Sequence, residues 1–178
     1  MSENLREETR QTVLSTDIFV FTVGVAPVFL DRATGDLRLQ TNEGSDIRRL
    51  LRECDFRTLS VEENVENLCQ IIAKIREHRP EAAIFLTLSP VPLNATFEYP
   101  SAVMADCVSK SVLRVSIDQI ERMNLPNVYY WPAFEAVRWL GAYQGNTFGE
   151  DDGSTRHVSL HTIDAIIGAF VDRIRKQD

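Results

Sequence analysis

The sequence contains few of the residues from which disulfides and metal centres are built. Its 178 residues include three cysteines and three histidines. The cysteines are odd in number and form no CxxC pair, so we expect free thiols, typical of a reducing cytoplasm, and no disulfide framework. Cysteines and histidines do not combine at the spacing of a metal site, and no motif indicates another cofactor. We therefore expect neither a metal nor a cofactor.

Basic residues are also in the minority, at 19 Lys and Arg against 26 Asp and Glu, which gives a net charge of −7. Nucleic acids and anionic membranes attract clustered basic side chains, so we expect neither as a partner. The longest apolar stretch, residues 19–30, is interrupted by Pro27 and is too short to span a bilayer. Small molecules, glycans and other proteins are the partner classes that remain.

Common catalytic signatures are missing as well. The chain has no G-x-S-x-G, G-x-G-x-x-G, Walker or H-E-x-x-H motif, and it has no internal repeat. What is present is a hydrophobic fraction of 44% and a charged fraction of 25%, both typical of a globular protein. The length predicts a single domain over residues 1–178.

Three apolar runs predict buried strands. They occupy residues 17–24, 82–89 and 127–131. Segments of helical period separate them, which predicts right-handed βαβ crossovers and hence a three-layer α/β/α fold with a parallel sheet. Ligands of such folds bind beyond the carboxyl ends of the strands. We therefore expect Gly24, Ser89 and Glu135 to meet His157 at one rim of the sheet.

The helices carry recognisable start signals. Ser60 and Glu63 form a capping box before a helix that ends near His78, and Ser159 is expected to cap the last helix. The apolar side chains of the last helix that we expect to face the core are Ile163, Ile166, Ile167 and Phe170. Further helices are expected over residues 3–15 and 101–123, loops over residues 27–59 and 141–157, and a small hairpin over residues 28–40.

His157 is the strongest candidate for chemistry. It follows the acidic run Glu150-Asp-Asp152, and a carboxylate a few residues upstream is able to hold the tautomer of a histidine base. The alternative is a solvated charge pair on a loop. The other two histidines, His78 and His161, lie at helix ends and are expected to be exposed.

Three further positions have a structural and a functional interpretation. Gly24 either permits a positive φ or close backbone approach, or is a turn glycine. The Ser89 hydroxyl either takes part in chemistry or bonds the backbone of its turn. Glu135 either acts chemically or is a partnered carboxylate that fixes a loop.

Five segments resemble the GSCFA family in order and spacing over nearly the whole chain. They are Phe19–Gly24, Leu86–Leu93, Ser109–Ser111, Tyr130–Glu135 and Arg156–Ser159. GSCFA domains are similar to SGNH hydrolases, which cleave or transfer esters with a Ser-His-Asp arrangement on a flavodoxin-like sheet. The resemblance implies the same fold and an ester as substrate.

The resemblance also implies roles for single residues. His157 matches the general base, and Asp152 or Asp151 is expected to orient it through the turn at Gly153, because Ser154 stands where the family aspartate usually does. Gly24 matches the strand end that offers a backbone donor to the oxyanion. Ser89, Lys110 and Glu135 match family positions to which the resemblance assigns no role, and a further alternative is that Ser89 or Ser109 is the nucleophile. The catalytic candidates are His157, Asp152 and Ser89, and the substrate-binding candidates are Thr22, Gly24, Lys110 and Glu135.

The Gly-Ser-Cys-Phe-Ala stretch, which carries the nucleophile in the family, does not occur in residues 1–16, ahead of the first strand. We expect this chain to represent the C-terminal part of the domain, with a sheet that is incomplete at its N-terminal side and an open edge that a second copy or a partner chain covers. The predicted function is that of an esterase or acyltransferase on acylated glycans or similar esters, with the nucleophile supplied from elsewhere. The alternative is a non-catalytic domain that binds glycan or protein.

Overall fold

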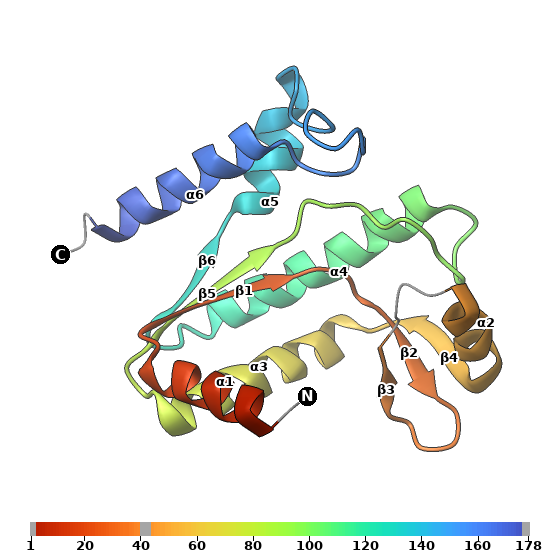
Figure 1. Ribbon diagram of the computed structural model, residues 1–178, viewed down its shortest axis with the longest axis horizontal. Helices are drawn as coiled ribbons and strands as arrows, with labels where there is room; N and C mark the ends of the chain where they lie inside the picture. The colour runs from red at the N-terminus through yellow and green to blue at the C-terminus, as the bar shows by residue number, and fades with distance from the viewer. Residues whose placement is uncertain (1–2, 40–43, 176–178) are drawn as a thin grey trace.

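The computed structural model describes residues 3–39 and 44–175 (Figure 1). Helices and strands alternate along much of the chain. The elements are α1 (Glu3–Ser15), β1 (Ile18–Val23), β2 (Pro27–Asp31), β3 (Leu37–Arg38), α2 (Gly44–Glu53), β4 (Cys54–Thr58), α3 (Val61–His78), β5 (Ala83–Leu88), α4 (Ala102–Arg122), β6 (Val128–Trp131), α5 (Ala133–Glu135), η1 (Ala136–Leu140), η2 (Gly141–Tyr143) and α6 (Leu160–Arg175).

The main sheet is parallel, with strand order β1-β5-β6. Thr87 of β5 is aligned with Thr22 of β1 and with Trp131 of β6, so the three strands end at a common rim. α3 and α4 cover one face of this sheet and α6 lies on the other, which gives three layers (Figure 1). The predicted α/β/α class is confirmed. Within the described residues, no strand pairs with the outer edge of β1.

The core lies between the sheet and the layer of α3 and α4. Ile84, Leu86 and Leu88 of β5 are at most 1% exposed and pack with Leu113 of α4. Because a strand directs successive side chains to opposite faces, Thr87 belongs to the face on which α6 lies. The two faces of β5 therefore serve different purposes, one as core and the other as the wall of a site.

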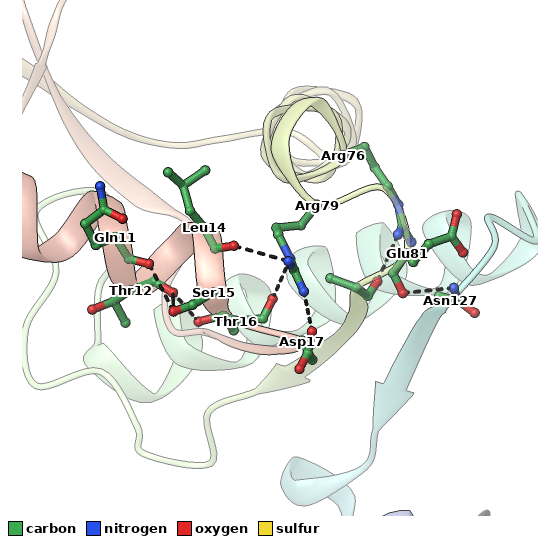
Figure 2. Close-up of polar contacts among 11 residues, drawn as sticks. Gln11, Thr12, Leu14, Ser15, Thr16, Asp17, Arg76, Arg79, Glu81 and Asn127 are labelled. Atoms are coloured by element: carbon green, nitrogen blue, oxygen red, sulfur yellow. Dashed lines mark hydrogen bonds and ion pairs between the residues drawn. The ribbon is translucent and has the colours of Figure 1, made fainter.

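The predicted start of α3 is confirmed. The Ser60 hydroxyl accepts a hydrogen bond from the Glu63 backbone at 3.2 Å, and the Glu63 carboxylate accepts one from the Ser60 backbone at 2.8 Å. At the other end of the helix, Arg79 donates to the Thr16 carbonyl at 3.1 Å and pairs with Asp17 (Figure 2). Arg79 thereby ties the end of α3 to the segment that enters β1.

The prediction of loops over residues 27–59 is wrong in part. The expected hairpin forms as β2 and β3, but α2 and β4 form as well, and β4 pairs with β2 to give an antiparallel sheet of order β3-β2-β4. In β4, Cys54 and Phe56 pack on Phe29, while Asp55 between them is polar and exposed. This alternation is the signal of a strand with one covered face, but it extends over only five residues.

The C-terminal helix corrects two predictions. No side chain of α6 is fully buried, and Ile167 is 54% exposed, because the apolar stripe faces a groove and not a packed layer. The Ser159 hydroxyl, expected to cap this helix, has no hydrogen-bond partner among the described residues. The Asp151 carboxylate accepts the Leu160 backbone N–H at 2.7 Å in its place.

Short helical turns follow β6. α5, the π-helical turn η1 and the 3-10 turn η2 carry the chain to Tyr143, so the expected loop over residues 141–157 begins three residues later than predicted. None of the helices in residues 3–39 and 44–175 has the length and apolar composition needed to cross a membrane.

Candidate functional site

A groove of about 560 Å³ lies between the sheet and α6. This volume falls in the range of small-molecule sites. Thr22, Thr87 and His157 contribute polar side chains to the lining, and none of the described Asp, Glu, Lys or Arg residues takes part in it. The remaining lining residues are Val20, Leu88, Pro90, Val91, Trp131, Ala133, Val137, Val158, Ile163, Ile166, Ile167 and Phe170.

His157 lines this groove with about half of its side chain exposed, and its Nδ1 atom contacts the Asp152 carboxylate. An ionised carboxylate only accepts hydrogen bonds, so Nδ1 carries the proton of the neutral imidazole and Nε2 keeps a free lone pair. The hydrogen bonds from His157 and from the Ser154 backbone lower the pKa of Asp152. The pair has the arrangement in which a carboxylate orients a histidine base.

The local backbone explains how Asp152 reaches His157. Gly153 has a φ of +70°, a conformation that favours glycine, and it reverses the chain between them. The Ser154 N–H donates to Asp152 at 2.9 Å, and the His157 N–H donates to the Ser154 carbonyl at 3.0 Å. Of the two carboxylates that the sequence left open, Asp152 is therefore the partner of His157, and Asp151 bonds the start of α6.

His161 occupies a different environment from His157. Its Nδ1 atom lies 3.2 Å from the Glu150 carboxylate, its side chain is exposed, and it does not line the groove. It has a carboxylate partner like His157 but no contact with the site. His161 is therefore a suitable control position.

Lys110 holds the loop that follows β1. It is only 3% exposed, and its Nζ atom donates to the Gly24 carbonyl at 2.8 Å. Burial lowers the pKa of Lys110 to about 8, although the nearby Asp106 acts to raise it. Gly24 has no positive φ, and a Cβ atom there would meet nothing within 4 Å. Neither backbone conformation nor close approach of another segment therefore requires glycine at this position.

Two further residues of α4 fix neighbouring loops. The Ser109 hydroxyl accepts the Ala26 backbone N–H at 2.8 Å. The Asp106 carboxylate accepts the Leu93 backbone N–H at 2.9 Å and pairs with Arg138 at 2.5 Å. We call Asp106, Ser109 and Lys110 the loop-fixing cluster. All three are buried, and none of them lines the groove.

Ser89 and Glu135 are also engaged by the protein itself. The Ser89 hydroxyl accepts the Val91 backbone N–H at 3.3 Å, as expected of a turn serine. Glu135 accepts from Arg114 of α4 at 2.8 Å and from the Tyr130 hydroxyl at 2.6 Å. Neither residue lines the groove. Glu135 is thus a partnered carboxylate that fixes its loop, and its partner Arg114 belongs to α4, on the face of the sheet opposite to the groove.

Of the seven candidate residues, the structure places Thr22, His157 and Asp152 in or beside the groove, and the other four in contacts outside it. Sequence reasoning missed Thr87, which lines the groove at 6% exposure and whose hydroxyl has no hydrogen-bond partner among the described residues. The sequence signal that could have identified Thr87 was its hydroxyl, the one polar side chain of the otherwise apolar strand β5. A buried hydroxyl without a partner is available to a ligand.

Comparison with models of protein families gives a match over most of the chain. The model of the GSCFA family matches residues 1–170. Searches of curated proteins and of solved structures returned no match. The matched range includes all three strands of the main sheet, the His157 loop and most of α6.

Proposed function

Since the chain belongs to the GSCFA family, we propose that its domain acts on a carboxylic ester, as an esterase or an acyltransferase. One observation carries this proposal: His157 is paired with Asp152 through Nδ1 and lines an apolar groove at the rim of a parallel sheet. The SGNH hydrolases, which GSCFA domains resemble, use a histidine and an aspartate in this way. A general base must be oriented and accessible, and His157, with its carboxylate partner and half-exposed side chain, meets both requirements.

The proposed reaction transfers an acyl group between two oxygens. His157 Nε2 takes the proton of the attacking hydroxyl while the hydroxyl oxygen forms a bond to the ester carbonyl carbon. The tetrahedral intermediate then breaks the bond to the alcohol oxygen, and His157 returns the proton to that oxygen. Attack by water gives a carboxylic acid and an alcohol, and attack by an acceptor alcohol gives a new ester. Asp152 stabilises the imidazolium that forms between the two steps.

The substrates that we propose are acylated glycans or similar esters. The resemblance to SGNH hydrolases supports an ester, and the half-exposed position of His157 leaves room on the solvent side for a large alcohol such as a sugar. The net charge of −7 is consistent with a neutral glycan and unfavourable for a polyanionic one.

Hydrolysis of p-nitrophenyl acetate tests the proposed function. We expect the rate of the parent protein to fall by about 10²-fold or more in His157→Ala, as for loss of a general base. Asp152→Asn is expected to cause a comparable fall, because an amide no longer fixes the tautomer. His161→Ala is the matched control, since it also removes a histidine with a carboxylate partner, and it is expected to keep the parent rate. Equal rates in all four proteins would refute catalysis by His157.

A further inference from the structure

We propose that the groove between α6 and the main sheet holds an aliphatic acyl chain, with the carbonyl end beside His157 and Thr87. This inference rests on the proposed function, because it names the substrate class of the same site.

The composition of the groove selects a ligand with an uncharged, apolar body. Val20 on β1 and Ile167 on α6 are 50% and 54% exposed, although both line the groove. A ligand that covers them removes apolar surface from water, which contributes about 25 cal/mol per Å². A charge on the part of the ligand that lies along these apolar residues would find no side chain of opposite charge in the described lining, and its desolvation would oppose binding.

The polar groups of the groove lie near one end. His157 precedes α6, and Thr87 stands one residue before the end of β5, so both belong to the rim where the strands end. The Thr87 hydroxyl is buried without a partner in the described part of the chain, and a carbonyl oxygen would accept its hydrogen bond. The ester group is therefore placed at the rim, and the hydrocarbon chain extends away from it.

The length of the groove sets the length of the chain. Ile163 and Phe170 of α6 both line it, and seven residues of a helix span about 10 Å. The Phe170 ring packs against Phe85 and against Trp131, with ring centroids 4.9 and 5.1 Å apart. This aromatic contact forms part of the wall of the groove. An extended chain advances by about 1.2 Å per bond, so a straight chain of roughly eight carbons fills the distance.

Trp131 provides a direct readout of binding. It lines the groove, whereas the second of the two tryptophans, Trp139, is exposed and does not. In a Trp139→Phe background, titration with sodium butanoate, hexanoate and octanoate is expected to change the Trp131 fluorescence in a saturable manner. We expect the affinity to rise about fourfold for each added methylene and to level off beyond roughly eight carbons.

A pair of substitutions on α6 makes the test specific. Ile167→Asp places a charge in the groove at a half-exposed position that does not depend on core packing, and it is expected to abolish octanoate binding. Ala169→Asp, on the same helix but outside the lining, is expected to bind like the parent. Suberate, which carries a second carboxylate at the tail end, is expected not to bind.

The outcomes separate this inference from the proposed function, because binding of octanoate needs no turnover. Chain-length-dependent binding without esterase activity supports the acyl groove and refutes catalysis. Esterase activity that depends on His157, with no binding of octanoate, refutes the acyl groove alone. A parent protein that sediments as a dimer, becomes monomeric in Ile167→Asp and binds no octanoate would show that a second copy covers the groove, and it would overturn the inference.

Discussion

Lys110 offers the most quantitative test of the structure. Its side chain is 3% exposed, and burial lowers its pKa from 10.5 to about 8. A tenfold change in a proton-binding constant is worth about 1.4 kcal/mol, so the charged form of Lys110 costs about 3 kcal/mol of folding free energy. The perturbation that exposes this cost is Lys110→Met, which keeps most of the side-chain volume and removes the charge.

The sign of the pH dependence follows from the direction of the pKa change. Well below pH 8, Lys110 is protonated in both the folded and the unfolded protein, and the full cost is present. Between about pH 8 and pH 10.5 the folded protein loses this proton while the unfolded chain keeps it, so stability rises with pH. The free energy of unfolding of the parent, minus that of Lys110→Met, is therefore expected to increase by roughly 2.5 kcal/mol from pH 7 to pH 10.

Urea denaturation of both proteins at half-unit intervals of pH measures this difference. Other groups that titrate in the range cancel, among them Tyr130, whose pKa is raised by burial and by its hydrogen bond to Glu135. Lys74→Met is the control, since it removes an exposed lysine from α3. A difference that is flat, or that decreases as the pH rises, would show that Lys110 is not a buried cation bound to the Gly24 carbonyl.

Urea denaturation at pH 7 also tests three local features. Ser60→Ala is expected to lower the free energy of unfolding by about 1 kcal/mol, because it removes the capping box of α3; no change would contradict the cap. Asp151→Ala is expected to destabilise the protein by a similar amount, since the Asp151 carboxylate bonds the start of α6. Ser159→Ala is expected to be neutral or slightly stabilising, because it removes a buried hydroxyl that has no partner among the described residues. A larger loss of stability in Ser159→Ala than in Asp151→Ala would restore Ser159 as the cap. Gly24→Ala is expected to change stability by less than about 0.5 kcal/mol, because the added methyl group meets open space, and a loss of several times that amount would contradict the backbone conformation at this position.

The strands and long helices were predictable because their signals are local and repeated. β5 is a continuous apolar run, and α3 combines a capping box with an apolar stripe over 18 residues. α2 and β4 were not predicted, because α2 is rich in arginine and β4 alternates over only five residues. Short elements depend on partners that are distant in sequence: β4 exists as the neighbour of β2, and its Phe56 ring packs on Phe29 and Phe97.

The candidate site was predictable where a local turn builds it and unpredictable where the tertiary fold does. Asp152 and His157 are five residues apart, and a glycine between them forms the turn that joins them. Thr87 had no such local signal. It lines a groove only because α6, more than 70 residues later in the sequence, lies over this face of the sheet. The apolar stripe of α6 was recognised, but sequence periodicity reports only which residues share a face, and not whether that face is covered.

The loop-fixing cluster shows why resemblance to a family identifies positions more readily than roles. Buried polar groups are nearly always paired, and Asp106, Ser109 and Lys110 each bond a backbone group of one of the two loops that follow β1 and β5. One helix thereby fixes both loops at the rim where His157 lies. A lysine and an aspartate near a site attract a catalytic interpretation, but here each is buried beneath the rim. The groove itself has a few polar side chains among apolar ones, which is why we propose His157 as its reacting group and an apolar chain as its ligand.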